Sequence, residues 1–139
     1  MRAKDAVGRY GERVAARHLE QQGIEVLDRN WRGAGGELDI LARDGDVLVA
    51  VEVKTRRGTA FGHPAEAVTE AKLGRIRRLT GQWLAEHRAE HRAVDGPGPG
   101  VGSRSGPPVP RFAEVRVDVI AVVLPRAGAA QVEHLVGVL

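Results

Sequence analysis

Apolar and polar positions alternate along residues 36–54 in a way that predicts a β-hairpin. Two apolar runs, residues 36–42 and 47–54, flank an Asp44-Gly45 pair, and such a pair is a strong hairpin signal. In the second run one face carries only valines, while the other face carries, in order, Leu48, Ala50, Glu52 and Lys54. An acid and a base therefore lie side by side on an otherwise apolar strand. Burying charge there is costly unless the groups pair with each other or bind a metal.

The register of this hairpin decides where Asp39 lies. A turn at Asp44-Gly45 pairs Asp39 with Ala50, whereas a turn at Gly45-Asp46 pairs Asp39 with Glu52. Directly opposed residues point to the same face, so both registers bring Asp39 to the face that carries Glu52. The hydrophobic pattern therefore predicts a cluster of two carboxylates and the neighbouring lysine ammonium.

The rest of the chain predicts an α/β protein with a mixed sheet. Helical periodicity predicts helices over residues 6–22 and 64–90. Alternating or short apolar runs predict further strands over residues 24–27, 111–123 and 132–138. A helix that links the third and fourth strands as a crossover makes that pair parallel. The Gly- and Pro-rich residues 93–110 have almost no apolar mass, so we expect a disordered excursion there.

Two charged residues stand out on the predicted helices. The inward face of the first helix centres on four residues, with Ala15 and Leu19 widening it; the four are Val7, Tyr10, Gly11 and Val14. Glu12 falls at the border of this face, where a salt-bridged boundary residue is one interpretation. Lys72 falls in the middle of the apolar stripe of the second helix. Because that helix should pack across the hairpin, we interpret Lys72 as pointing toward the face of Asp39 and Glu52.

Composition permits a nucleic-acid partner without requiring one. The 139 residues predict one domain spanning residues 1–139, with a net charge of +3 and a sequence pI of about 9.9. Only Lys4, Lys54 and Lys72 are lysines, so 18 of the 21 basic residues are arginine, which suits phosphate binding and equally suits a GC-rich genome. The absence of cysteine excludes disulfides and thiolate zinc sites. No signal peptide or membrane-spanning run is visible, so we expect a cytoplasmic protein that does not bind membranes.

Two carboxylates and a lysine on one sheet face suit a hard divalent cation. Mg²⁺ usually binds through one or two carboxylates, with waters and substrate phosphates completing its shell. Such a metal lowers the pKa of a bound water, and a nearby ammonium can orient that water or stabilise negative charge in the transition state. The alternative is a simple Glu52–Lys54 ion pair on a half-exposed strand, since E-x-K is a common tripeptide.

Asp39 followed by Glu52-Val53-Lys54 resembles the D…(D/E)-x-K signature of the PD-(D/E)XK nuclease superfamily. The wider sequence is similar to the YraN-like family of small, mostly uncharacterised bacterial proteins, which are themselves similar to Holliday-junction resolvases. The matching segments are Gly8-Arg9-Tyr10-Gly11-Glu12, Arg29-Asn30-Trp31-Arg32, Gly36-Glu37-Leu38-Asp39-Ile40 and Val51-Glu52-Val53-Lys54-Thr55-Arg56. The resemblance covers roughly residues 7–84, with a weaker match over residues 116–123. The proline of the superfamily motif is absent before Asp39.

The resemblance implies a restriction-endonuclease-like αβββαβ core and a metal-dependent nuclease that acts on DNA, with branched junctions among the candidate substrates. Asp39, Glu52 and the carbonyl of Val53 would bind Mg²⁺ or Mn²⁺, and Lys54 would serve the attacking water. The supporting residues implied are Glu12, reaching the metal site from its helix, and Lys72. RNA is not excluded as a substrate, and a homodimer is one expected assembly because junction cutters are commonly dimers. The alternative is a nucleic-acid-binding protein of the same fold without turnover.

Several further residues have two interpretations. Arg29 and Arg32 can hold phosphates while Trp31 between them stacks on a base, or Trp31 can simply cover the sheet edge. Arg56 and Arg57 follow the Lys54 strand and suit phosphate contacts, or form an ordinary charged loop. Asp118 can support the site, or can be a structural acid at a strand end, which the pattern favours.

The segment from His87 to His91 matches the zinc-hydrolase pattern H-x-x-E-H. It has no apolar shell around it, so we interpret it as a charged helix end.

Overall fold

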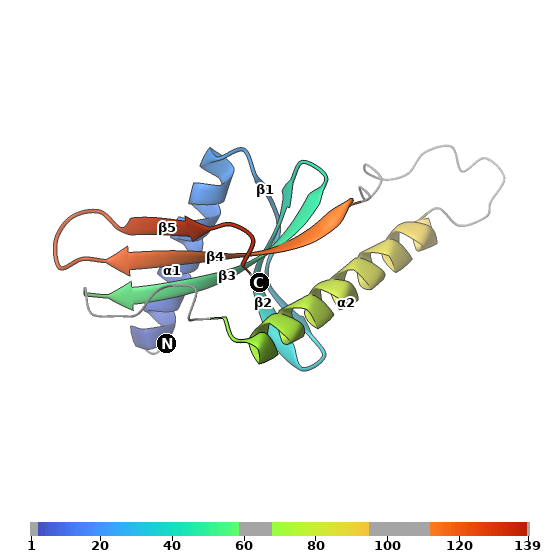
Figure 1. Cartoon of the computed structure of the whole chain (residues 1–139), viewed down its shortest axis with the longest axis horizontal. Coiled ribbons are helices and arrows are strands. Elements are labelled where there is room, and N and C mark those ends of the chain that lie inside the picture. The colour runs from blue at the N-terminus through green and yellow to red at the C-terminus, as the bar shows by residue number, and fades with distance from the viewer. Residues whose placement is uncertain (1–2, 59–67, 95–111, 139) are drawn as a thin grey trace.

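The computed structural model describes residues 3–58, 68–94 and 112–138. The elements in chain order are α1 (Ala3–Gln21), β1 (Glu25–Gly33), β2 (Gly36–Asp44), β3 (Val47–Arg57), α2 (Glu70–Val94), β4 (Glu114–Leu124) and β5 (Gln131–Leu135) (Figure 1). The strands form one sheet in the order β1-β2-β3-β4-β5, in which only β3 and β4 run parallel. This arrangement confirms the predicted mixed α/β fold, with a restriction-endonuclease-like αβββαβ core and β5 as an additional edge strand.

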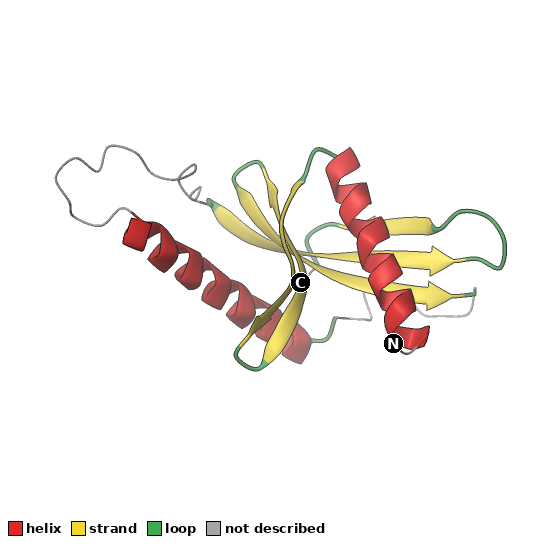
Figure 2. Cartoon of the chain, turned by 180° about the vertical axis from the view of Figure 1, so that it is seen from behind, coloured by secondary structure: helices red, strands yellow, loops and turns green. Residues whose placement is uncertain are grey.

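The two helices cover opposite faces of the sheet. Seen from behind, α1 crosses the near face while α2 lies on the far side (Figure 2). Leu19 of α1 packs with Ile40, Val49 and Ile120 in one buried cluster, and residues of α2, Leu79 among them, pack with Leu41, Leu48 and Ala50 in the other. Full burial of each such side chain contributes about 1.5–3 kcal/mol, so both helices are held by packing. Neither helix in the described ranges combines the length and apolar character needed to cross a bilayer.

The face that α1 buries agrees in part with the predicted one. Gly11, Ala15 and Leu19 were expected on it and are buried, whereas Tyr10 was expected at its centre and is 39% exposed. The reason is a close approach at Gly11, where any Cβ would overlap the side chain of Thr55 on β3. The helix therefore rests on its small residues. It ends in a Schellman motif, with Gly23 at a φ of 80° and the Ile24 amide bonded to the Leu19 carbonyl at 2.9 Å.

Several element boundaries also differ from the sequence prediction, among them the start of β4 at Glu114 rather than residue 111 and the end of β5 at Leu135 rather than residue 138. β1 continues to Gly33 rather than ending at residue 27, because it is an edge strand whose polar residues stay partly exposed and so carry little hydrophobic signal. Within the described residues α2 begins at Glu70 rather than at residue 64, since the hydroxyl oxygen of Thr69 caps it by accepting the Lys72 amide at 3.2 Å. Residues 93 and 94 belong to α2; residues 95–110 of the predicted excursion lie outside the described residues, as do residues 64–67.

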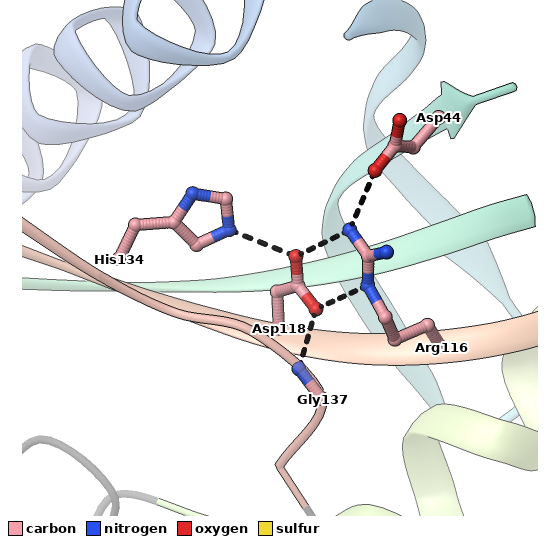
Figure 3. A network of polar contacts seen from close by, with 5 residues as sticks. All are labelled: Asp44, Arg116, Asp118, His134 and Gly137. Carbon is pink, nitrogen blue, oxygen red and sulfur yellow. Dashed lines mark hydrogen bonds and ion pairs between the residues drawn. The ribbon is translucent and has the colours of Figure 1, made fainter. Parts of the chain in front are cut away.

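Asp118 lies at the centre of a buried polar network on the α1 side of the sheet (Figure 3). One carboxylate oxygen accepts hydrogen bonds from Arg116 Nε and the Gly137 amide, both at 2.9 Å. The other accepts from His134 Nε2 at 2.8 Å and Arg116 Nη2 at 3.1 Å, and Arg116 also reaches Asp44 at 3.1 Å. The expectation of a strand-end acid was wrong, because Asp118 is fully buried in the middle of β4. It ties β5 and the segment after it to the sheet.

Candidate functional site

The β2–β3 hairpin turns at Gly45-Asp46, the second of the two predicted registers. Asp44 pairs with Val47, Ile40 pairs with Val51, and Gly45 has a φ of 62°, a value that favours glycine. Beyond Ile40 the carboxylate of Asp39 accepts a hydrogen bond from the Val53 amide at 2.9 Å. The Asp39 carboxylate therefore accepts the Val53 amide just beyond the point where the backbone pairing of β2 and β3 ends. This bond holds Asp39 against the backbone of the segment Glu52-Val53-Lys54.

The Asp39 carboxylate lies in an environment that opposes its ionisation. Its burial is the largest cause, and the nearby carboxylates of Glu52, Glu12 and Glu37 add to it. The Val53 amide works in the other direction, yet the pKa of Asp39 rises from 3.8 to about 7. Residues from α1, β2 and β3 therefore concentrate negative charge around one half-buried acid, which is the pairing that the sequence pattern predicted for Asp39 and Glu52.

Glu52 is held by α2 rather than by its strand neighbour Lys54. The Lys72 Nζ lies 2.6 Å from Glu52 Oε1, and the two side chains are only 24% and 15% exposed. Lys72 stands in the first turn of α2, directly after the Thr69 cap. It therefore points toward the Glu52 face, as its place in the apolar stripe indicated. The alternative Glu52–Lys54 ion pair is not present between these two described residues.

Glu12 enters the site because α1 lies so close to β3. Gly11 permits that approach, and the next residue, Glu12, lines a groove together with Asp39. Partial burial and the charge of Glu37 raise the pKa of Glu12, while a hydrogen bond from the side chain of Asn30 lowers it. Glu12 is thus part of the carboxylate cluster rather than a surface residue paired with an arginine.

Asn30 is a site residue that the sequence analysis did not single out. It is the only non-glycine residue of the described ranges with a positive φ, 51°, although it lies within β1. Its neighbours Arg29 and Trp31 pair with Ile40 and Leu38, so Asn30 stands across from Asp39 where the ladder is interrupted. Asparagine tolerates this backbone conformation better than most residues, and this tolerance is the one signal the sequence offered.

The carboxylate cluster opens into a groove of about 580 Å³. Its walls are Val7, Gly8 and Glu12 of α1, Asp39 of β2, and residues 53–57 at the end of β3. Lys54, Arg56 and Arg57 therefore line the same groove as Asp39, and Lys54 forms no ion pair with a described residue. This arrangement gathers an acid with a raised pKa and several cations around a space that a ligand can enter.

A second hollow of about 690 Å³ adjoins the first and shares Gly8 and Glu12 with it. It is lined by Arg9 and Arg13 of α1, by Arg29, Asn30 and Arg32 of β1, and by Glu37. Trp31 does not line it: the indole packs against the α2-side cluster, the position expected of a residue that covers the sheet edge. The structure thus separates Trp31 from the two arginines that flank it.

The donor atoms of the site suit a hard cation. Asp39, Glu52 and Glu12 offer carboxylate oxygens, and Mg²⁺ needs only one or two of these besides waters. Among the described residues no three acidic, histidine or cysteine side chains are gathered into a ready metal centre. Burial and, after it, the neighbouring carboxylates raise the pKa of Asp39, and a divalent cation between these acids would offset the repulsion between them.

The H-x-x-E-H segment offers little support for zinc. The ring of His87 stacks on Trp83 with centroids 3.9 Å apart, and its Nδ1 lies 2.8 Å from the Trp83 carbonyl oxygen. Trp83 in turn donates to Asp28 at 3.0 Å. His87 is therefore engaged in packing the helix, and the side chain of His91 lies outside the described residues.

The sequence matches known proteins over nearly its whole length. The model of the uncharacterised protein family UPF0102 matches residues 11–122. A UPF0102 protein of Beutenbergia cavernae is 57% identical over 138 residues, which cover 99% of both chains. One from Kineococcus radiotolerans is 54% identical over 99% of this chain and 97% of its own, and one from Streptomyces coelicolor is 50% identical over 99% and 92%. The chain therefore belongs to the UPF0102 family, the YraN-like family whose motifs surround Asp39 and Glu52.

Proposed function

We propose that this protein is a metal-dependent phosphodiester hydrolase, an endonuclease-like enzyme that acts on DNA with Mg²⁺ or Mn²⁺. The observation that carries the proposal is the environment of Asp39. A half-buried carboxylate with a pKa near 7, crowded by Glu12 and Glu52, stands in an open groove lined by Lys54, Arg56 and Arg57. Acids with strongly perturbed pKa values in a cleft are typical of functional sites.

Each residue has a distinct task in this proposal. Asp39, Glu52 and the Val53 carbonyl would hold the cation, and Lys72 would fix Glu52 by engaging Oε1 and leaving Oε2 to the metal. When bound, the metal lowers the pKa of a ligand water and neutralises charge on the phosphodiester. Lys54 would orient the attacking water, and Glu12 would complete the acidic cluster from α1. Arg56 and Arg57 would contact phosphates beside the scissile one.

Cleavage of a labelled substrate panel tests this proposal. Linear and branched DNA, with matched RNA, would be incubated with Mg²⁺, Mn²⁺ or a chelator. Wild type should cut in either metal and not in chelator, whereas Glu52→Gln and Lys54→Ala should each lower the rate at least 100-fold. Glu20→Gln, an exposed acid on α1, serves as the matched control and should cut like wild type. Metal-independent cleavage, or full activity of Glu52→Gln, would contradict the proposal.

The second candidate is a nucleic-acid-binding protein without turnover. The short Lys72–Glu52 contact favours it, because Lys72 already balances the charge of Glu52 that a catalytic metal would otherwise neutralise. The two candidates separate in one comparison. If wild type binds DNA in chelator but neither binds Mn²⁺ by calorimetry nor cuts any substrate, the binding function stands and the hydrolase is excluded.

A further inference from the structure

The two hollows share Gly8 and Glu12. The catalytic proposal uses only the cations of the first hollow, and the second adds four arginines: Arg9, Arg13, Arg29 and Arg32. We propose that the two hollows form one continuous track for the phosphodiester backbone of a single nucleic-acid strand, which crosses α1 at Gly8. The arginine-lined hollow would then hold phosphates remote from the one at Asp39. The identity of the ligand rests on the proposed function, but the track itself rests on the geometry of α1 and β1.

The charge of the second hollow fits a polyanion. Arg9, Arg13, Arg29 and Arg32 line it, opposed by the two carboxylates of Glu12 and Glu37. Only one close ion pair forms among these described residues, a 3.5 Å contact between Arg32 and Glu37 that is largely exposed to solvent. Exposed pairs of this kind are weak, so the guanidinium groups stay available for phosphates, whose geometry they match.

Two elements contribute these cations, which favours a strand lying between them. Arg9 and Arg13 are one helical turn apart on α1 and therefore project to the same side. Arg29 and Arg32 come from β1, on the other wall. The guanidinium of Arg13 also lies 5.8 Å from the ring centroid of the exposed Tyr10, which holds that arginine at the rim. A backbone in this hollow would meet arginines from both walls.

Gly8 marks the passage between the hollows. It lines both of them, and no heavy atom stands within 4 Å of the position that a Cβ would take. Glycine inside a helix costs about 0.5–1 kcal/mol relative to alanine, and neither packing nor backbone conformation requires it here. Gly11, by contrast, is required by its contact with Thr55. A side chain at position 8 would project into the passage without disturbing the fold.

Obstruction of the passage tests the proposal directly. Binding of the full-length protein to labelled 12-nucleotide DNA and RNA strands would be measured by fluorescence anisotropy in chelator. Gly8→Leu should weaken binding at least tenfold while leaving the melting temperature unchanged or higher. Gly74→Leu is the matched control, since Gly74 is also a helical glycine with open space around it, on α2. Equal affinities of Gly8→Leu and wild type would overturn the proposal.

Removal of charge tests the arginine end independently. The double variant Arg9→Gln plus Arg13→Gln should weaken binding and flatten its salt dependence by about 1.4 in the log–log slope, because each phosphate that an arginine neutralises on a single strand contributes roughly 0.7. Arg75→Gln plus Arg77→Gln on the exposed face of α2 removes the same charge and should leave the slope unchanged. A comparable weakening in both double variants would mean nonspecific attraction and would overturn the track.

These outcomes are separable from the catalytic proposal. If wild type cuts DNA but the Gly8 and Arg9/Arg13 variants bind normally, the track is wrong and the hydrolase stands. If no substrate is cut but these variants lose binding as expected, the track stands alone. If wild type binds neither DNA nor RNA strands, the track is overturned. The preferred strand in the anisotropy assay identifies the nucleic acid.

Discussion

Asp39 and Asp118 are two shielded carboxylates on the same sheet with opposite surroundings. Asp118 is fully buried and accepts four hydrogen bonds, from Arg116, His134 and the Gly137 amide. Asp39 is less buried but accepts one hydrogen bond from the described residues, and its burial, followed by the charges of three neighbouring carboxylates, raises its pKa. Both acids are shielded from water, and they differ in how completely hydrogen bonds compensate that shielding: Asp118 stabilises the fold, whereas Asp39 is poised to receive a ligand.

The same contrast holds for the cations. Asp118 raises the pKa of the Arg116 guanidinium, first through its hydrogen bond and then through its charge, so acid and base stabilise each other. Lys54, beside Asp39, has no such partner in the described part of the chain. The Asp118 network is closed by the protein itself, whereas the Asp39 groove is left open to outside charge.

The largest expected change in the free energy of unfolding comes from disrupting the hydrogen-bond network around Asp118. Asp118→Ala leaves Arg116 and His134 without their shared partner beneath α1, and breaking a buried pair in this way costs about 3–5 kcal/mol. Urea unfolding at pH 7 measures the loss. Asp46→Ala in the exposed hairpin turn is the control and should cost less than about 0.5 kcal/mol. A loss below about 1 kcal/mol for Asp118→Ala would show that the network contributes little to stability.

Asp39→Asn should stabilise the protein, whereas Asp118→Ala should destabilise it. Because the folded-state pKa of about 7 exceeds the unfolded value of 3.8, the folded protein binds the proton more tightly, so stability falls as the pH rises from about 4 to about 7 and stays low above that range. Asparagine removes that loss and can still accept the Val53 amide. The variant should be more stable than wild type by up to about 4 kcal/mol at pH 8, with almost no gain at pH 4. A lower melting temperature of the variant at pH 8 would contradict the strained-acid interpretation.

Metal binding should depend on pH, because the metal competes with the proton on the Asp39 carboxylate. A cation at Asp39 has to displace it, so Mn²⁺ affinity should rise about tenfold between pH 6 and pH 8, as the ionised fraction of a group with a pKa near 7 does. Isothermal titration calorimetry at three pH values measures this rise. Glu20→Gln, the exposed acid on α1, is the control and should keep the pH dependence of wild type. A flat profile would mean that Asp39 does not hold the metal.

The smallest stability effect is expected at Asn30. Asn30→Gly suits the positive φ but removes the hydrogen bond to Glu12, so stability should change by less than about 0.5 kcal/mol while the pKa of Glu12 rises further. Carbon-detected NMR titration reports that pKa. Asn30→Ala also loses the bond but must hold an unfavourable backbone conformation, which costs about 1–2 kcal/mol. Equal stabilities of the two variants would mean that the backbone at position 30 is unstrained.

The sequence predicted those parts of the site that depend on periodicity. Alternation along β3, which holds for either of the two predicted hairpin registers, placed Asp39 on the face of Glu52, and the helical stripe placed Lys72 toward them. Tyr10 was misplaced because hydrophobicity alone set the helix face, whereas contact between Gly11 and Thr55 sets it in the structure. The Asp118 network joins residues 44, 116, 118, 134 and 137, and no local pattern reports a partner so distant in sequence.

The parallel pairing of β3 with β4 has a consequence for synthesis of the chain. Three strands and α1 can leave the ribosome and form their hairpins while β4, which begins at Glu114, is still missing. During that interval the valine-rich β3 is an exposed sheet edge, the kind of surface at which nascent chains aggregate. Its final residues, Lys54 to Arg57, carry three positive charges, and charge on an edge strand discourages such pairing. The cations that line the groove in the folded protein would therefore also protect the unfinished sheet.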